Sequence, residues 1–329
     1  MVASRQLLSD YLNEWYKSYY IPNHEQTSYK RAERIIRNNI LPYIGHIPLS
    51  ELTTDHVQTF YNLLLEKGKV SRKQGVESRS ELSPRTVKYV HTILNQALSH
   101  AVKRDRIFEN PCADAIPPKD KKKAKDKWVV LEAEQLKEYL ADEKVMNHRD
   151  FALIHTAAYS GARQSELLGL PKTNILWNKS AIKIEKSLHV DEDAEDGFEY
   201  KDSTKNETSE RTVKLSKKAM QVLKEHIEKQ EAAGIESDLV FTEPDGRPIA
   251  KNNLGSRYRK LAKACGYEGM TFHHLRHAHA TILLKGGAYI VAVSKRLGHA
   301  SPNITLSTYA HWIPQDDFTL VEKFDELLE

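Results

Sequence analysis

The sequence predicts a mainly α-helical protein with a small antiparallel β-sheet, an α+β fold, built as a helical N-terminal bundle and a mixed C-terminal domain. Apolar residues recur at three- and four-residue intervals along most of the chain, which is the spacing of amphipathic helices. Strand-like alternation is confined to residues 181–215. Residues 116–127 are rich in proline and lysine, so we expect an extended basic linker between residues 1–115 and residues 128–329.

The composition fits two globular domains. A chain of 329 residues, of which 40% are apolar and 29% charged, can bury a core in each domain. No apolar stretch is long enough to span a bilayer and no secretory signal is evident, so we expect a cytoplasmic protein without membrane contact. The two cysteines, Cys112 and Cys265, are far apart and lack ligand spacing, which fits a reducing compartment and no structural disulfide.

Charge is divided unevenly along the chain. The net charge is +4, but residues 1–127 carry 22 Lys+Arg against 14 Asp+Glu, whereas residues 128–329 carry 27 against 31. A basic N-terminal part suggests contact with a polyanion, and linker lysines can neutralise phosphates. A solvated lysine-rich surface explains the same balance, and charge alone favours neither interpretation.

Two helices are expected at the start of the chain. The second begins near Gln26, and we expect Pro42 and Gly45 to stop it. The first carries apolar residues at helical spacing, namely Leu7, Leu8, Tyr11, Leu12, Trp15 and Tyr19.

Two further helices complete the predicted bundle. Thr53 or Thr54 is expected to cap the third helix, and Ser83 followed by Pro84 is a start signal for the fourth. Between them, residues 67–81 are polar, charged and glycine-containing, which predicts a loop. Four helices without strand patterning predict a small bundle.

The C-terminal part combines helices with a short β region. We expect strands at residues 181–188, 198–203 and 211–215, and an acidic loop at residues 191–197. We expect helices at residues 132–140, 151–160, 217–232, 252–264, 274–284, 290–297 and 301–309. From about residue 316 the chain forms an amphipathic tail that can dock on a neighbouring protomer or on its own domain; its apolar residues are Phe318, Val321, Phe324 and Leu328.

Five residues of the C-terminal part form a set whose chemistry fits a phosphodiester. They are Arg163, His273, Arg276, His299 and Tyr309. Two arginine forks can grip the non-bridging oxygens, and His299 can donate a third hydrogen bond. Tyr309 is the candidate nucleophile, and His273 is the candidate acceptor for the proton of a phenol whose ordinary pKa is about 10.

The leaving oxygen also needs a proton, and Lys205 is the candidate donor. It lies in a turn expected between two strands, and nearby cations favour loss of its proton. Lys201 is the nearest alternative. The set calls for no metal and no other cofactor, and a metal site at His273, His274 and His277 is disfavoured because no carboxylate or cysteine lies at useful spacing.

Other polar residues near the candidate set have a structural interpretation. Glu166 is interpreted as a partner that orients nearby groups, not as a catalyst. His277, His279 and His311 are interpreted as structural or surface histidines. Each motif alone is weak, but four motifs in a fixed order are specific.

The order of these motifs resembles the catalytic domain of the tyrosine recombinases, the phage integrase family. The shared motifs are an arginine in a Gly-x-Arg-x-x-Glu-Leu box, a His-x-Leu-Arg-His box, a Leu-Gly-His box and a tyrosine about ten residues later. All four occur in order from Ser160 to Tyr309, although Ser160 stands where the family often has threonine. Six residues match positions of the family's catalytic set: Arg163, Lys205, His273, Arg276, His299 and the nucleophile Tyr309.

The resemblance implies a site-specific DNA recombinase or integrase that needs neither metal nor ATP and forms a 3′-phosphotyrosyl intermediate. It likens the helical part to the family's core-binding domain. It further implies a homotetramer on double-stranded DNA core sites, a Holliday-junction intermediate, and possible accessory DNA-bending or excision factors. The host element would be a phage or conjugative transposon of a bacterium, and the protein would be associated with the nucleoid.

Two other functions stay open, and so does the presence of an additional N-terminal domain. A type IB topoisomerase-like enzyme uses a similar tyrosine and clamp, and a non-catalytic DNA-binding regulator could keep the fold alone. Many phage and transposon integrases carry an additional N-terminal arm-binding domain, which is not evident here. We therefore expect either a trimmed chain or a member of the family that binds core sites only.

Overall fold

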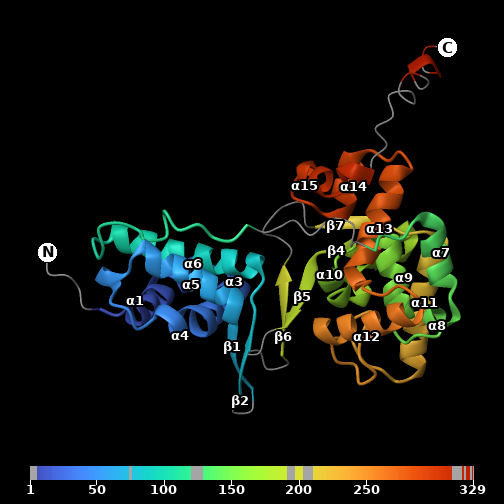
Figure 1. Ribbon diagram of the computed structural model, residues 1–329. Coiled ribbons are helices and arrows are strands. Elements are labelled where there is room, and N and C mark those ends of the chain that lie inside the picture. Colours follow the sequence, from blue (N-terminus) through green and yellow to red (C-terminus); the bar gives the residue numbers. More distant parts are fainter. Residues whose placement is uncertain are drawn as a thin grey trace. The chain divides into compact units, whose positions relative to one another are not determined.

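The computed structural model describes residues 6–73, 76–119, 129–190, 197–202 and 210–312, with Val321, Phe324, Asp325, Glu326 and Leu328 of the tail. The chain forms two compact units, Met1–Lys125 and Asp126–Glu329 (Figure 1). The predicted fold class is confirmed, because both units are mainly helical and their strands form small antiparallel sheets. Most of the basic linker, of the acidic loop and of the tail lies outside the described residues.

The first unit is a helical bundle with one added hairpin. Its core includes Leu8, Ile40, Tyr61 and Leu94, all of which are buried. Its elements are, in order, α1 (Leu8–Trp15), η1 (Tyr16–Tyr20), α2 (Ile21–Asn23), α3 (Gln26–Ile35), η2 (Ile36–Ile40), α4 (Leu41–Ile44), η3 (Leu49–Glu51), α5 (Thr54–Lys67), β1 (Lys69–Lys73), β2 (Val76–Ser80) and α6 (Pro84–Lys103).

Proline and the capping residues position the helices of this unit. The second expected helix continues past Pro42 and ends at Gly45, because Pro42 lies in the first turn of α4, where its missing N–H costs little. Thr53 caps α5 and Ser83 caps α6, each accepting a hydrogen bond from the backbone N–H three residues later.

The prediction of a loop at residues 67–81 is wrong, and so is the prediction that the bundle contains no strands. The strands β1 and β2 pair antiparallel, from Lys69 opposite Ser80 to Lys73 opposite Val76. The segment has no alternation of apolar and polar residues, so the usual sequence signal of a half-buried strand is missing. Backbone pairing in a hairpin defines these strands without that signal.

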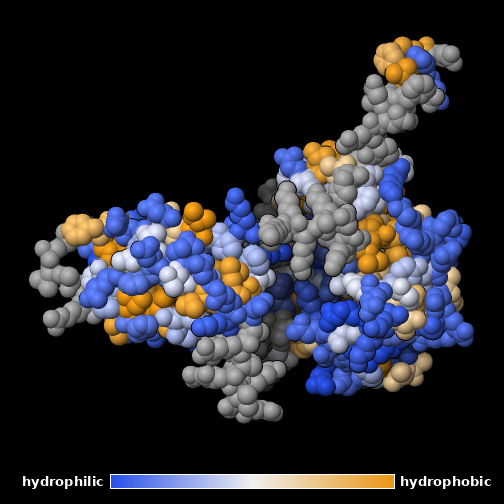
Figure 2. Space-filling model, viewed as in Figure 1, coloured by the Kyte–Doolittle hydropathy of each residue, from blue (hydrophilic) through white to orange (hydrophobic). Residues whose placement is uncertain are grey.

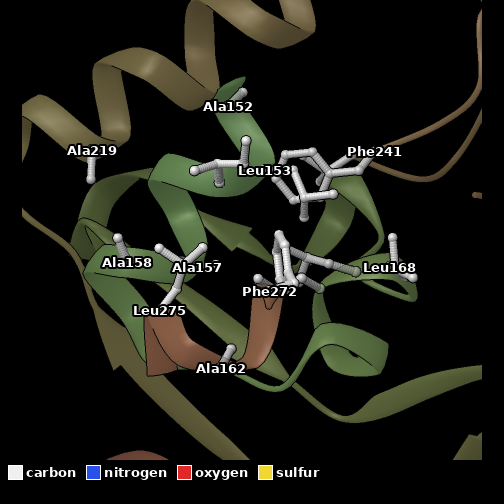
Figure 3. Close-up of a cluster of buried hydrophobic side chains, with 14 of the residues drawn as sticks. Ala152, Leu153, Ala157, Ala158, Ala162, Leu168, Ala219, Phe241, Phe272 and Leu275 are labelled. Atoms are coloured by element: carbon white, nitrogen blue, oxygen red, sulfur yellow. The ribbon is translucent and has the colours of Figure 1, made fainter. Parts of the chain in front are cut away.

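The second unit surrounds one apolar helix. The helix α9 is buried along most of its length and packs against α11 and α13. Figure 3 shows Leu153 and Ala157 of α9 close to Phe272 and Leu275 of α13. The unit's elements are α7 (Ala133–Ala141), α8 (Glu143–Met146), α9 (Phe151–Ser160), α10 (Gln164–Leu168), η5 (Lys172–Asn174), β3 (Ile175–Leu176), η6 (Trp177–Lys179), β4 (Ala181–Ile184), β5 (Lys186–Val190), β6 (Phe198–Asp202), β7 (Arg211–Lys214), α11 (Lys217–Ala232), α12 (Lys251–Ala264), α13 (Phe272–Lys285), α14 (Ile290–Leu297), α15 (Pro302–Tyr309) and η7 (Ala310–Trp312).

The β region forms two small sheets where one was expected. The predicted strand at residues 181–188 is divided at Glu185 into β4 and β5. The first sheet has the order β3-β4-β7 and the second pairs β5 with β6, all antiparallel. The strand β7 begins at Arg211, whose side chain reaches the candidate site described below.

The surface of each unit is mixed in character. On the face seen in Figure 2, hydrophilic side chains cover most of both units and apolar side chains form separate patches. None of the described helices combines the length and the apolar character that a membrane span requires.

Candidate active site

Arg163 lies at the junction of two helices of the second unit. Gly161, with a φ of +66°, ends α9 in the left-handed conformation, and Arg163 is the N-cap of α10. Its backbone N–H donates to Glu166 at 2.7 Å, and its guanidinium donates to Glu166 and to the carbonyl of Gly298, each at 2.7 Å. The side chain is fixed in this way while 38% of it stays exposed.

Glu166 joins Arg163 to a second arginine. Its buried carboxylate, 4% exposed, accepts two hydrogen bonds from Arg211, at 3.1 and 2.8 Å. Burial would raise the pKa of Glu166, but hydrogen bonds and positive charge from Arg211 and Arg163 lower it below its usual value. Glu166 therefore stays ionised and orients both guanidinium groups, in the structural role expected for it.

Arg276 is the buried member of the predicted phosphate-gripping pair, Arg163 and Arg276. It lies on α13, is 3% exposed, and donates from Nη1 to the carbonyl of Gly161 at 2.8 Å. Its Nη2 is buried without a hydrogen-bond partner among the described residues. Burial, followed by the charge of Arg163, lowers the pKa of Arg276 to about 9, so the group is still a cation at neutral pH. An unpaired donor on a buried cation favours binding of an anion.

The two candidate histidines lie beside these arginines. Burial and the charge of Arg276 lower the pKa of both His273 and His299 to about 4, although His273 keeps an exposed face. His299 shares a hydrogen bond of 2.6 Å between its Nδ1 and the hydroxyl of Thr305. If Thr305 donates this bond, the other ring nitrogen of His299 carries the proton and can donate to a phosphate oxygen.

Tyr309 ends α15 and is almost completely buried, with 1% of its surface exposed. Its hydroxyl oxygen lies 2.7 Å from Nδ1 of His277. Burial raises the pKa of Tyr309 to about 12, and the charge of Arg276 opposes that rise. From the sequence, His277 is expected to be a structural or surface histidine, and His273 is the expected proton acceptor. Of these two described histidines, His277 is the one that contacts the hydroxyl, and the role of His273 stays a prediction.

Five of the six predicted residues lie close enough together for their charges to affect one another's pKa values. Arg163 and Tyr309 both influence the pKa of Arg276, and Arg163 and Arg276 both influence that of His299. The sixth, Lys205, lies outside the described residues, as does the side chain of the alternative Lys201. No cluster of three His, Cys, Asp or Glu side chains suited to a metal occurs in the described part of the chain.

Arg211 and His277 lie close to these five residues but were missed as functional candidates. Arg211 opens a strand, and nothing in its local sequence signals a carboxylate partner 45 residues away. His277 had a usable signal, because it lies one helical turn after His273 and therefore on the same face of α13.

The family comparisons agree with these motifs. Residues 129–315 match the Phage integrase family, and residues 7–65 match the family described as Phage integrase, N-terminal SAM-like domain. A protein named Tyrosine recombinase XerC-like, from Caldanaerobacter subterraneus subsp. tengcongensis, is 27% identical over 97% of this chain and 83% of its own length. The ICEBs1 integrase of Bacillus subtilis is 24% identical over 91% of this chain and 78% of its own.

Solved structures share the fold. The Tn1549 transposon integrase in complex with a circular intermediate DNA gives a TM-score of 0.76 at 17% identity, covering 98% of this chain and all of that one, 100%. A lambda integrase tetramer bound to a Holliday junction gives a TM-score of 0.64 at 17% identity, covering 90% of this chain and 78% of that one. Because the family match spans more than half of the chain and includes every ordered motif, the chain belongs to the phage integrase family, the tyrosine recombinases, which are site-specific DNA strand transferases.

Proposed function

We propose that this recombinase cuts and rejoins DNA at specific sites through a 3′-phosphotyrosyl bond to Tyr309. The observation that carries the proposal is Arg276, a buried cation whose Nη2 has no partner among the described residues and which lies close enough to Tyr309 to affect its pKa. A phosphodiester oxygen supplies both the negative charge and the hydrogen-bond acceptor that this guanidinium lacks. The nucleophile and the anion site are therefore neighbours.

The other groups of the site have complementary roles in the proposal. Arg163 has a partly exposed side chain whose guanidinium Glu166 and Gly298 hold in place, so it can grip the second non-bridging oxygen without reorganising. His299 donates a third hydrogen bond to the phosphate. Together they neutralise the charge that otherwise repels an attacking oxygen.

The covalent step exchanges one ester for another. The Tyr309 oxygen forms a bond to phosphorus while the bond from phosphorus to the 5′ oxygen breaks. The phenolic proton passes to a base, for which His273 is proposed, and the 5′ oxygen takes a proton from Lys205. The new phosphotyrosyl ester conserves the energy of the broken phosphodiester bond, so a 5′ hydroxyl of another duplex can reverse the attack without ATP.

A nicked suicide substrate tests the nucleophile. Cleavage next to the nick releases a short fragment that diffuses away, so a covalent protein–DNA adduct accumulates and is visible on a denaturing gel. We expect the adduct with the natural chain and none with Tyr309→Phe. An adduct that persists in Tyr309→Phe would refute Tyr309 as the nucleophile, and no adduct from either chain would favour a non-catalytic regulator.

A type IB topoisomerase-like activity needs a different measurement. Such an enzyme relaxes any supercoiled plasmid and needs no second site. We expect strand exchange between two core sites and no general relaxation of plasmids that lack them. Relaxation without exchange would favour the topoisomerase alternative.

The domain assignment is part of the proposal. We assign residues 1–115 to core-DNA binding, residues 116–127 to a linker along the DNA, and residues 128–329 to catalysis. The basic balance of residues 1–127 and the N-terminal family match support the first assignment. The tail from about residue 316 would dock on a neighbouring protomer or on its own domain.

The assembly and the biological setting are proposed from relatives. The lambda integrase is seen as a tetramer on a Holliday junction, which supports four copies of this chain on two duplexes. The Tn1549 and ICEBs1 integrases support integration or excision of a phage or conjugative transposon. In this proposal the protein acts in the bacterial cytoplasm at the nucleoid, with possible accessory DNA-bending or excision factors.

A further inference from the structure

The proposed nucleophile is shielded in this structure. The Tyr309 ring packs in an apolar cluster with Ala280, Leu284, Val293 and Leu297, and 1% of the residue is exposed. Attack on phosphorus requires that the hydroxyl oxygen reach the phosphate in line with the leaving oxygen. A residue so enclosed offers no such approach, so this position of Tyr309 is a resting position.

One side chain holds the hydroxyl in that position. Within the described residues, the Tyr309 hydroxyl has a single hydrogen bond, 2.7 Å long, to Nδ1 of His277. His277 is itself buried, at 8% exposure, and the two ring centroids lie 5.6 Å apart. Because both groups are shielded from water, breaking this bond without a replacement leaves the phenol hydroxyl buried without its hydrogen-bond partner.

Both partners of this hydrogen bond are neutral at neutral pH. Burial raises the pKa of Tyr309 to about 12, so the phenol keeps its proton at neutral pH. Burial, followed by the charges of His273 and other neighbours, lowers the pKa of His277 to about 3, so its imidazole is neutral. In the tautomer of His277 that carries its proton on Nε2, the phenol donates and Nδ1 accepts.

His273 does not share this contact. Its ring stands edge-on to that of His277, with centroids 4.6 Å apart and an interplanar angle of 86°. Among the described residues it has no hydrogen bond to Tyr309. The two histidines of one helical face therefore differ in position, one open to solvent and one bonded to the reacting oxygen.

We propose that His277 is a positioning residue for Tyr309, which accepts the hydrogen bond of the tyrosine and holds it, protonated and buried, until engagement with DNA releases it. This inference rests on the proposed function, in which Tyr309 is the nucleophile. On release, the hydroxyl exchanges the imidazole of His277 for the phosphate held by Arg163 and Arg276.

Nitration of the DNA-free full chain with tetranitromethane tests the holding role. The reagent modifies accessible tyrosines, and peptide mass spectrometry measures each tyrosine separately. Tyr289, which is 85% exposed, serves as the reactive standard, and the fully buried Tyr258 reports on folding. We expect Tyr309 to be as protected as Tyr258 in the natural chain.

Three substitutions at one position separate the hydrogen bond from the packing. His277→Phe keeps a ring but removes the acceptor, and we expect nitration of Tyr309 to rise by about two- to tenfold, the range that loss of one hydrogen bond gives. His277→Asn places an amide oxygen near the position of Nδ1 and should keep Tyr309 protected. His277→Gln places that oxygen one bond farther away and should not. His274→Asn, in the same turn of α13, is the control for general loosening.

Two results would overturn the inference. One is a protected Tyr309 in His277→Phe when Tyr289 reacts normally. The other is equal nitration of Tyr309 in His277→Asn and His277→Gln, a comparison that stays informative if His277→Phe fails to fold and exposes Tyr258.

A second readout separates this inference from the proposed function. On a suicide substrate with a single site, His277→Phe should form adduct at least as fast as the natural chain, because the tyrosine is already released. Loss of the adduct with an accessible Tyr309 would overturn the holding role and make His277 a requirement of the reaction. An adduct from Tyr309→Phe would instead defeat the proposed function, whereas nitration needs no catalysis.

Discussion

The two parts of the candidate site are held in different ways: the phosphate clamp, formed by Arg163 and Arg276, and the nucleophile Tyr309. Arg163 is tied by hydrogen bonds to Glu166 and Gly298, and Glu166 is tied in turn to Arg211, which also donates to the carbonyl of Arg296 at 2.8 Å. These charged bonds join α10, β7 and the end of α14 into one network. Tyr309 lies on the short helix α15, and within the described residues its side chain has a single hydrogen bond, to His277.

This difference fits the work that each half must do. A clamp stabilises a transition state best when its donors are already in place, because no reorganisation is then needed. A nucleophile that leaves a covalent bond in DNA benefits from staying unavailable until the correct site is bound. The charged network therefore predicts rigidity in the clamp, and the single bond predicts mobility in the nucleophile.

The largest expected effect comes from removing the fork of Arg276. Arg276→Lys keeps the charge but loses the geometry that grips two oxygens, so we expect adduct formation to fall about 10²- to 10³-fold. The stability of the second unit should change less than cleavage, because the charge is kept and the lost Nη2 donor has no partner among the described residues. Single-turnover cleavage measures the first effect and thermal unfolding the second.

A matched change away from the site calibrates Arg276→Lys. Arg247→Lys alters an exposed arginine that pairs with Asp245 and should leave both measurements unchanged. Near-natural cleavage by Arg276→Lys would show that the buried arginine is not part of the clamp.

Loss of the Glu166 charge should mainly lower the stability of the fold, whereas Arg276→Lys should mainly lower the rate of cleavage. Glu166→Gln leaves the Arg163 and Arg211 guanidinium groups without their buried counter-charge, and we expect the second unit to lose about 3 kcal/mol of unfolding free energy. Glu134→Gln, which breaks an exposed pair with Lys137, should cost less than about 0.5 kcal/mol. Equal losses for the two variants in urea unfolding would contradict a rigid network.

The pH dependence of stability tests whether the negative charge of Glu166 stabilises the fold. The folded-state pKa of Glu166 is below its usual value, so its contribution is present above the unfolded pKa, about 4.3, and disappears as the pH falls through the folded value. We therefore expect the stability gap between the natural chain and Glu166→Gln to be largest near neutral pH and to shrink in acid. A gap that widens below pH 4 would mean that the charge of Glu166 does not stabilise the fold.

Local sequence signals predicted most of the helices. The bounds expected for residues 151–160, 217–232 and 290–297 match α9, α11 and α14, because apolar periodicity and clear end signals coincide there. Gly161 and Gly298, for example, end α9 and α14 in the left-handed conformation. The β1–β2 hairpin was missed because its polar residues carry no alternating pattern.

Long-range pairing could not be predicted from the sequence. The ordered motifs indicated which residues form the candidate set, and five of them lie together in the fold. The motifs did not indicate that Arg211 bonds Glu166, 45 residues away, or that Tyr309 bonds His277, 32 residues away. Such contacts depend on how helices and strands pack, which periodicity along the chain does not specify.

A smaller effect is expected from a methyl group added beside the clamp. Gly298 has a φ of +68°, and a Cβ there would come within 2.6 Å of Nη1 of Arg211. Gly298→Ala should therefore cost about 1–2 kcal/mol for the backbone and also displace Arg211. Gly287→Ala has a similar φ of +80° but open space around it, so it measures the backbone strain alone. Equal thermal shifts for the two variants would mean that Arg211 yields without cost.

The smallest effect on folding is expected in the tail, where the consequence should fall on assembly. Phe324 and Leu328 are 62% and 72% exposed, so changing both to serine should alter unfolding free energy by less than about 0.5 kcal/mol. If the tail docks on a neighbouring protomer, the double variant should form fewer tetramers on DNA in sedimentation velocity. Tyr289→Ser removes a still more exposed ring elsewhere, 85% exposed, and should leave assembly unchanged. Unchanged assembly in the tail variant would place the tail on its own domain.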